Sequence, residues 1–301
     1  MQALSPVPGS LQVDATLGGG GHAVRILEAN APDGRLLGLD ADQAAIARCA
    51  VRLASFGERA VLRQANFEEL AGLAPAAGFE RVDGVLFDLG LSSFQLADEE
   101  RGFSFRAEGP LDLRFDPTRG RPASALLEEL DERELARVLR AHGEEPFAGR
   151  IARAIVAERE RGPIASAARL GALVERVVPT PRGGRRRTHP ATRTFQALRI
   201  AVNRELEVLP AALAAAVDLL RPGGRLVVLA YHSLEDRIVK RFVAAERRGC
   251  VCPPVLPVCV CGHSARLRPI GPSPAFPTAE EVAHNPRARS ARLRAAERLA
   301  A

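Results

Sequence analysis

The chain has 301 residues, of which 47% are hydrophobic and 26% are charged, with a formal net charge of +6. This composition is ordinary for a folded globular protein and argues against a disordered chain. No apolar run is long enough to span a bilayer, and residues 1–9 lack the features of a signal peptide. We therefore expect a cytoplasmic protein of one large or two smaller domains, with no membrane partner. Aromatic residues make up only 4%, which argues against extensive base stacking.

Strands and helices are expected to alternate through the first ninety residues, as in a doubly wound α/β sheet with its ligand at the carboxyl ends of the strands. The expected strands are 11–15, 36–40, 61–64, 82–89 and 225–231. The expected helices are 23–29, 43–56, 132–139, 147–161, 167–177, 210–220 and 235–247. From about Phe105 to Glu207 we expect no strand, which indicates a helical insertion. The last fifty residues, rich in Pro and Arg, are expected to wrap the surface.

A glycine-rich turn joins the first expected strand to the first expected helix. It reads Asp-Ala-Thr-Leu-Gly-Gly-Gly-Gly-His from Asp14 to His22. Glycines at such a turn let backbone N–H groups approach a ligand closely. The next expected strand ends in Asp40, where a carboxylate can bind the two hydroxyls of a ribose. The start of the chain therefore predicts a site for a nucleoside-containing cofactor.

The turn matches neither the dinucleotide pattern G-x-G-x-x-G nor the P-loop pattern G-x-x-x-x-G-K-[ST]. Asp14 would repel a pyrophosphate, but it suits a cationic ligand such as a sulfonium or an amino group. S-adenosylmethionine carries both groups and a ribose, so it is the cofactor we favour. The alternative is a glycine-rich turn with no ligand.

Candidate catalytic residues follow the expected strands or lie in the Gly- and Phe-rich stretch 101–115, which could form a lid. The candidates are Asp88, Ser92, Ser93, Asp112 and His232. The two serines could hold an acceptor base or cap the next helix. The residues after His232 could likewise simply begin a helix.

Two short segments of the sequence stand out, one rich in arginine and one rich in cysteine. Arg182 to Arg187 form a glycine-spaced basic segment of the kind that contacts nucleic-acid phosphates. The sulfur cluster consists of Cys250, Cys252, Cys259 and Cys261, with His263 beyond. Four close thiols in a cytosolic protein indicate zinc rather than disulfides, although C-x-C pairs are less usual than C-x-x-C in zinc sites. Redox pairing and a metal-free thiol loop are the alternatives. Cys49 is expected to pack in the core.

Together these motifs resemble the RsmH (MraW) family of ribosomal RNA small-subunit methyltransferases. The matching blocks are DATLGGGGH at 14–22, DGVLFDLGLSS at 83–93, RGFSF at 101–105, GPLDLRFDP at 109–117, HPATRTFQALRIAVN at 189–203, YHSLEDRIVKRF at 231–242 and NPRARSARLRAAER at 285–298. The resemblance implies S-adenosylmethionine-dependent N4-methylation of one cytidine in 16S rRNA, at the decoding centre of the small ribosomal subunit. It also implies a Rossmann-like class I methyltransferase domain with an inserted all-helical domain.

We place the methyltransferase domain at 1–106 and 206–301, and the inserted domain, expected to recognise RNA, at 107–205. In the family, cofactor contacts fall on positions that correspond here to Gly20, Gly21, His22, Asp40, Phe67, Asp88 and Gln95. Family members usually carry a longer segment with H-x-P-V-L-L before the first strand. Here only about ten residues precede that strand, so either the true start lies upstream or the chain has lost a helix that covers the cofactor cleft, a loss that would affect cofactor affinity. The sequence leaves the oligomeric state open, a homodimer included.

The implied reaction needs a positioned amine, because the lone pair of the cytosine N4 is delocalised into the ring. It must lie about 3 Å from the methyl group, and its N–H must find an acceptor. The motif S/D-P-P-Y of many amino-methyltransferases is absent, and DLGLSS stands in its place. We expect Asp88 and the backbone of 89–92 to orient the amine, with Asp112 or His232 helping to take the proton. No metal is expected in catalysis, and the base must be unpaired or flipped out.

Three other functions are alternatives to an rRNA methyltransferase. A DNA amino-methyltransferase is disfavoured by the absent S/D-P-P-Y motif and by the insertion. A nicotinamide-dependent dehydrogenase is disfavoured by Asp14 and by the glycine spacing. A non-catalytic RNA-binding protein would leave Asp14, Asp40 and Asp88, all expected at strand ends, unexplained.

Overall fold

The computed structural model describes residues 1–179, 189–250, 252–253, 256, 258, 260–262 and 264–300. The chain divides into two compact units. The α/β unit comprises Met1–Gly90 and Leu206–Ala301, and the helical unit comprises Leu91–Glu205. Among the described helices, none is long and apolar enough to cross a membrane.

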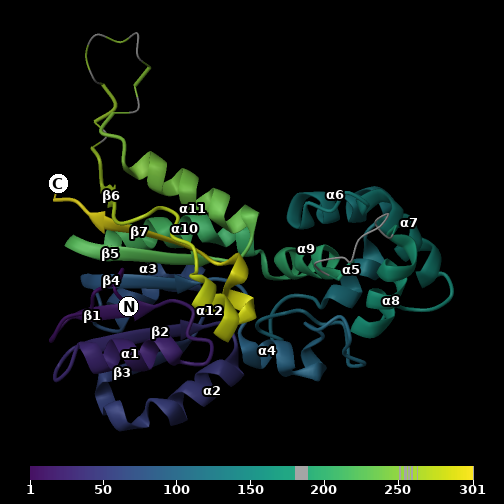
Figure 1. The fold of residues 1–301 in the computed structure, drawn as a ribbon, viewed down its shortest axis with the longest axis horizontal. Coiled ribbons are helices and arrows are strands. Elements are labelled where there is room, and N and C mark those ends of the chain that lie inside the picture. Colours follow the sequence, from purple (N-terminus) through teal and green to yellow (C-terminus); the bar gives the residue numbers. More distant parts are fainter. Residues whose placement is uncertain are drawn as a thin grey trace. The chain divides into compact units, whose positions relative to one another are not determined.

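The α/β unit is built on a mixed sheet of seven described strands (Figure 1). These are β1 (Leu11–Asp14), β2 (Arg35–Asp40), β3 (Ala60–Gln64), β4 (Val82–Asp88), β5 (Leu220–Ala230), β6 (Leu267–Pro269) and β7 (Arg292–Arg298). In the order β3-β2-β1-β4-β5-β7-β6, the first five are parallel, and β7 and β6 pair antiparallel. Because β1 pairs with both β2 and β4, the strand order reverses there, and ligands of such sheets bind at the carboxyl ends beside that reversal.

Helices cover both faces of this sheet. They are α1 (Gly21–Ala29), α2 (Gln43–Arg52), α3 (Leu70–Ala76), α10 (Glu205–Leu219) and α11 (Ser233–Glu246). The unit also contains α12 (Ala279–His284), which has no buried residue, and the 3₁₀ turns η1 (Ala54–Arg59), η2 (Phe67–Glu69) and η4 (Pro286–Ser290). Residues alternate between the faces along each strand. In β4, Leu86 packs in the core with α1 and α2, whereas Val85 and Phe87 pack in the core with α3, α10 and α11. The sheet is therefore apolar on both sides, as expected for buried parallel strands.

The helical unit has its own apolar core. Its elements are α4 (Ser93–Ala97), η3 (Glu99–Arg101), α5 (Ala123–Glu129), α6 (Glu132–Gly143), α7 (Ala148–Arg159), α8 (Ala167–Val177) and α9 (Thr192–Asn203). The unit begins at Leu91 rather than at residue 107, because Leu91, Leu96 and Phe103 pack in the same core as the later helices. The described residues between 105 and 207 form no strand beyond an isolated bridge of Pro110 with Ser166, as predicted.

The expected elements of the first ninety residues are present, with one shortened. The helix expected at 43–56 ends at Arg52, and a 3₁₀ turn follows. Cys49 is fully buried, as predicted.

The prediction that the last fifty residues only wrap the surface is wrong, because β6 and β7 extend the sheet. The apolar signal of β7 is weak: its buried residues include Ala295, Ala296 and the cation Arg294. Arg294 donates hydrogen bonds of 2.7 and 3.2 Å to the two carboxylate oxygens of Asp236. Burial opposes the ionisation of Asp236, but the hydrogen bonds from Arg294 and Arg292 hold its pKa below the ordinary value. Arg294 therefore weakens the apolar pattern of β7 in the sequence, and its ion pair with Asp236 joins β7 to α11.

Candidate active site

Three carboxylates end adjacent strands of the α/β unit. Asp14 closes β1, Asp40 closes β2 and Asp88 closes β4. The strand register places Asp14 beside Gly38 of β2 and Leu86 of β4. The predicted grouping of acids at the carboxyl edge of the sheet is therefore the arrangement that the structure has.

The glycine turn between β1 and α1 lies over these carboxylates. Gly18 and Gly20 have positive φ angles of 51° and 73°, which glycine adopts without strain. The Gly18 N–H donates to Oδ2 of Asp40 at 2.7 Å. A Cβ on Gly20 would lie 3.0 Å from the Cys49 sulfur, whereas a Cβ on Gly21 would meet no described atom within 4 Å. Gly20 thus packs against the protein, and Gly21 borders open space.

Asp14 is the most strongly perturbed acid of the group. Its side chain is fully buried, and Oδ1 accepts a hydrogen bond from the Thr16 N–H at 3.2 Å. Its Oδ2 is buried without a hydrogen-bond partner among the described residues. Burial raises the pKa of Asp14 to about 7, partly offset by nearby His22 and the Thr16 N–H. A buried acceptor with no donor is costly unless a ligand supplies one. A cationic donor group would fit this oxygen.

Asp40 is fixed by backbone donors. Its Oδ1 accepts from the Asp42 N–H at 2.9 Å, and its Oδ2 accepts from Gly18. A carboxylate offers about four acceptor positions, so two remain for other donors. Burial raises the pKa of Asp40 to about 6 against the effect of these hydrogen bonds. The remaining positions suit the two hydroxyls of a ribose.

Asp88 lies between two side-chain donors. Its Oδ2 is 3.3 Å from Nε2 of His22, and its Oδ1 accepts a 2.8 Å hydrogen bond from the Tyr231 hydroxyl. The hydrogen bond with Asp88 raises the pKa of His22, although burial opposes this. Burial, followed by the charge of Asp88, raises the pKa of Tyr231 above its ordinary value. The Asp88 N–H donates to the Thr16 hydroxyl at 2.6 Å. Side chain and backbone of Asp88 are therefore both held in place.

Phe67 lies one turn beyond β3. The Ala65 N–H donates to the Asp40 carbonyl at 2.9 Å, which brings the end of β3 beside that of β2. The Phe67 ring packs edge-on against Phe87 of β4, with 5.8 Å between ring centroids. The Phe67 ring therefore packs beside the strand that ends in Asp88.

Ser92 and Gln95 form a capping box at the start of α4. The Ser92 hydroxyl accepts from the Gln95 N–H at 3.2 Å, and the Gln95 side-chain oxygen accepts from the Ser92 N–H at 3.0 Å. Ser93 is the first residue of that helix. The sequence allowed Ser92 either to hold an acceptor base or to cap a helix. In this structure its hydroxyl caps α4.

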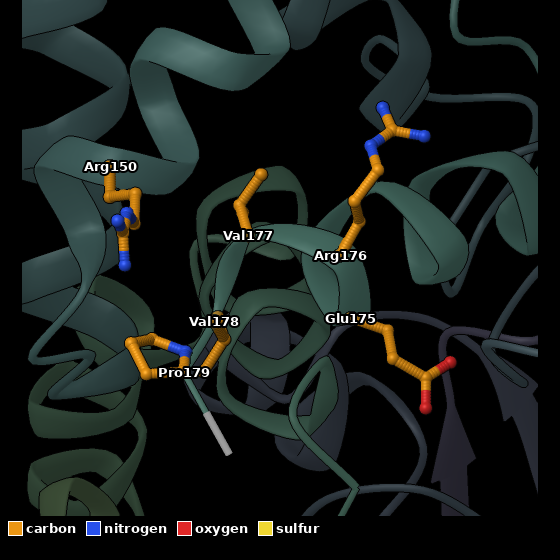
Figure 2. Close-up of a pocket in the computed structure, with 6 residues that line it drawn as sticks. All are labelled: Arg150, Glu175, Arg176, Val177, Val178 and Pro179. Atoms are coloured by element: carbon orange, nitrogen blue, oxygen red, sulfur yellow. The ribbon is translucent and has the colours of Figure 1, made fainter.

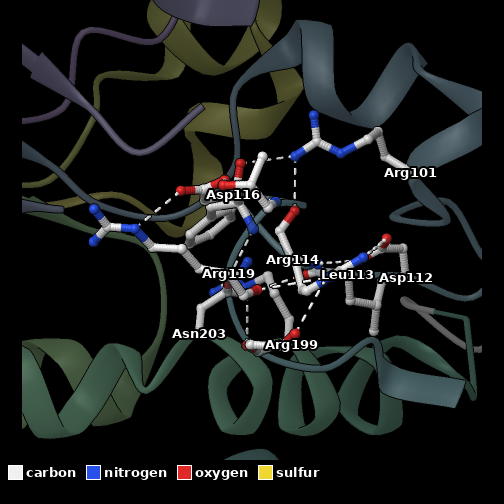
Figure 3. Close-up of polar contacts among 11 residues, drawn as sticks. Arg101, Asp112, Leu113, Arg114, Asp116, Arg119, Arg199 and Asn203 are labelled. Carbon is white, nitrogen blue, oxygen red and sulfur yellow. Dashed lines mark hydrogen bonds and ion pairs between the residues drawn. The ribbon is translucent and has the colours of Figure 1, made fainter. Parts of the chain in front are cut away.

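Asp112 is paired with a neighbouring cation (Figure 3). Both of its oxygens accept from the Arg114 guanidinium, at 2.7 and 2.8 Å. The hydrogen bond with Asp112 raises the pKa of Arg114. Asn203 of α9 joins this network by donating to the Leu113 carbonyl at 2.7 Å and accepting from the Phe115 N–H at 2.7 Å. Asp112 thus contributes to fastening the segment 111–115 within the helical unit.

His232 caps α11. Its Nδ1 accepts from the Glu235 N–H at 3.3 Å, and its Nε2 lies 3.0 Å from Oε1 of Glu235. Oε2 of Glu235 accepts from the Tyr231 N–H at 2.9 Å. His232 and Glu235 therefore fix the turn that carries Tyr231 toward Asp88.

The predicted basic segment, 182–187, lies outside the described residues. In the helical unit, a hollow of about 410 Å³ lies where α8 leads toward that segment (Figure 2). Its lining residues are Arg150, Glu175, Arg176, Val177, Val178 and Pro179. Arg176 also lies 3.3 Å from Glu158. Two arginines from different helices thus border a hollow near a basic stretch of sequence.

Tyr231 was not predicted from the sequence as a partner of Asp88. It is the only tyrosine in the chain and directly follows β5, which pairs with β4. Its position at a strand end is visible in the sequence. Its hydrogen bond with Asp88 could not be predicted, because it depends on the pairing of β4 with β5. Thr16, the acceptor for the Asp88 N–H, was missed for the same reason.

The chain matches one family and named relatives over nearly its whole length. The family described as the MraW methylase family matches residues 1–299. The chain is 58% identical over 298 residues to "Ribosomal RNA small subunit methyltransferase H" of Thermomicrobium roseum, covering 99% of this chain and 90% of that protein. It is 48% identical over 301 residues to the protein of the same name from Symbiobacterium thermophilum, covering 100% and 94%. An rRNA methylase structure from Streptococcus thermophilus aligns with a TM-score of 0.44 and 12% identity over 99% of this chain and 92% of that one.

Proposed function

Because the chain belongs to the MraW methylase family, we propose that it transfers a methyl group from S-adenosylmethionine to the N4 amine of one cytidine in 16S rRNA, at the decoding centre. The family membership makes it an rRNA methyltransferase that uses S-adenosylmethionine. The atom, the base and its place in the small ribosomal subunit are the parts proposed here. Membership also leaves no reason to prefer a dehydrogenase or a non-catalytic RNA-binding protein.

The residues at the strand ends fit this cofactor. Asp14 offers a buried oxygen that lacks a donor, Asp40 keeps acceptor positions for ribose hydroxyls, and Gly21 borders open space. We assign the remaining contacts to Gly20, His22 and Phe67. Gln95 and Asp88 complete the predicted set. When bound, S-adenosylmethionine supplies an electrophilic methyl group on a sulfonium.

The observation that carries the proposed chemistry is the fixed carboxylate of Asp88. Asp88 accepts a hydrogen bond from the cytosine amine and takes up its proton as the new bond forms. Tyr231 and His22 hold this carboxylate from two sides, at 2.8 and 3.3 Å. A preorganised acceptor avoids the cost of reorienting a carboxylate during the reaction. In this scheme Asp112 and His232 stabilise the local structure rather than take the proton. Asp112 pairs with Arg114, and His232 caps α11 through Glu235.

The helical unit is proposed to hold the RNA. Arg150 and Arg176 can contact phosphates, with the segment 182–187 as a second basic element. Phosphate contacts position an RNA without reading its sequence, so the choice of cytidine rests on the shape of the substrate.

The test is nucleoside analysis after methylation in vitro. Small ribosomal subunits from a strain lacking the homologous enzyme, naked 16S rRNA and DNA are each treated with protein and labelled S-adenosylmethionine. We expect N4-methylcytidine at a single position in rRNA, formed about 10² or more times slower after the Asp88→Asn substitution. Label on a carbon atom, on a ribose or chiefly on DNA would contradict the proposal.

A further inference from the structure

Residues 247–266 form an excursion of the chain between α11 and β6 of the α/β unit (Figure 1). Arg266 closes the base of this excursion. Its N–H donates to the Glu246 carbonyl at 2.8 Å, and its guanidinium pairs with Glu246 at 2.5 Å and Asp218 at 2.7 Å. The ends of the excursion are therefore fixed by hydrogen bonds and ion pairs.

Three sulfur atoms converge within this excursion. The Sγ atoms of Cys250, Cys252 and Cys261 all lie within 4.8 Å of one another. Those of Cys250 and Cys261 are 3.8 Å apart. A disulfide would need about 2.05 Å. Two thiolates bound to one tetrahedral zinc ion at about 2.3 Å each lie about 3.8 Å apart. The separation of Cys250 and Cys261 therefore fits shared coordination of an ion.

Backbone donors point to two of these sulfurs. The Cys252 N–H donates to the Cys250 sulfur, and the Val260 N–H donates to the Cys252 sulfur, both at 3.4 Å. Hydrogen bonds of this kind orient ligands around a metal and stabilise the negative charge of a thiolate. Two of the described backbone N–H groups of the excursion thus point at sulfurs of the cluster.

The apolar side chains described in this excursion are largely exposed. Leu256, Val258 and Val260 are 43%, 70% and 77% exposed. A segment that buries so little apolar surface gains little from the hydrophobic effect, and a bound metal ion commonly supplies the missing stabilisation in such small elements.

We propose that Cys250, Cys252 and Cys261 bind one Zn²⁺ ion with a structural role, apart from the methyl-transfer site. Binding converts each ligating thiol to a thiolate and releases its proton. Soft thiolate ligands suit zinc, whereas magnesium and calcium prefer oxygen. Cys259 lies outside the described residues and is not part of the proposal.

The test is the metal content of the full chain, purified under reducing conditions without chelator. We expect about one zinc per chain, and a near-ultraviolet thiolate-to-cobalt band after exchange with Co²⁺. The double variant Cys250→Ser/Cys261→Ser should lose about tenfold or more in zinc affinity. Cys49→Ala removes a cysteine outside the cluster and should keep the metal. Circular dichroism and S-adenosylmethionine binding show whether each variant is folded.

Three results would overturn the proposal. The first is folded, reduced wild-type protein that takes up no zinc when equimolar Zn²⁺ is added. The second is a Cys250–Cys261 disulfide, found by peptide mass spectrometry in protein alkylated directly from cells. The third is the iron content and visible spectrum of an iron–sulfur cluster.

Discussion

At the scale of single residues, Asp14 has the clearest conflict between stability and function. Its carboxyl group is fully buried, one oxygen has no hydrogen-bond partner among the described residues, and burial raises its pKa to about 7. Folding therefore favours the protonated form of Asp14, whereas a cationic ligand favours the ionised form. This is the pattern of a group kept for binding rather than for the stability of the free protein.

We expect Asp14→Asn to stabilise the protein at alkaline pH. Asp14 has a pKa of about 7 in the folded chain against 3.8 when unperturbed. A raised acid pKa means that the folded chain binds more protons, so its stability falls as pH rises from about 4 to about 7. Asparagine does not titrate, so the difference in unfolding free energy should grow over that range by at most about 1.4 kcal/mol per pH unit. Thermal unfolding at pH 5, 6, 7 and 8 measures it. The same difference at every pH would contradict the pKa assigned to Asp14.

We expect Tyr231→Phe to slow methyl transfer without weakening cofactor binding. The substitution removes the hydroxyl that donates to Asp88 at 2.8 Å but keeps the ring. The single-turnover rate should fall by about tenfold, and the effect of Asp88→Asn should be about 10² or more. Rapid-quench kinetics with saturating S-adenosylmethionine separates the rate from the affinity. An unchanged rate in Tyr231→Phe would remove the hydroxyl from the mechanism.

At the scale of elements, residues that the sequence predicts as parts of the site also serve as helix caps. Ser92 with Gln95 and His232 with Glu235 each form a capping box, and each box fixes a turn after a strand of the central sheet. The spacing S-x-x-Q is visible in the sequence and predicts a cap. His232 is less obvious, because histidine is a rarer cap than serine. Helix starts at these positions give the strand-end residues a fixed backbone.

The last two glycines of the turn should respond differently to substitution by alanine. Gly20 has a φ of 73°, and a Cβ there would lie 3.0 Å from the Cys49 sulfur, so Gly20→Ala should destabilise the fold by about 1–2 kcal/mol. Gly21 has open space around its Cβ position, so Gly21→Ala should leave the melting temperature nearly unchanged. Because this space is where we place the cofactor, Gly21→Ala should weaken S-adenosylmethionine binding by about tenfold. Thermal unfolding and calorimetric titration of both variants test the pair. Equal affinity in Gly21→Ala and wild type would place the ligand elsewhere.

At the scale of the whole molecule, most of the fold follows from local patterns. Apolar runs and helical periodicity predict β1 to β4, α1, and the helices α6, α7 and α8 of the insertion, because each pattern repeats within a single element. The addition of β7 to the sheet could not be predicted, since it depends on Arg294 meeting Asp236, far apart in the sequence. The acids of the site were predictable because parallel strands end at a common edge. Their partners were not, because Tyr231 and Asp88 meet only after β4 and β5 pair.

The helical unit should contribute charge-dependent RNA affinity. Replacing Arg150 and Arg176 with glutamine should weaken binding of 16S rRNA and lower the slope of log affinity against log salt by about 0.7 for each lost phosphate contact. Arg25→Gln, which removes one charge at an exposed position of α1, is the control for a general loss of charge and should leave the slope unchanged. Filter binding between low and moderate salt measures both quantities. If Arg25→Gln and the double variant behaved alike, the hollow would have no specific role.

The central claim, that the acids at the strand ends bind a cationic methyl donor, is tested most directly by calorimetric titration with S-adenosylmethionine across pH 6 to 8. Because Asp14 has a pKa of about 7, donor binding should release protons and the affinity should rise with pH. His22 also has a raised pKa beside Asp14 and Asp88, so its protons are released in the same direction. In Asp14→Asn the affinity at pH 8 should fall by about tenfold, and most of the pH dependence should disappear. A folded wild-type protein that binds no donor, or a variant with the same affinity and pH profile, would contradict the account.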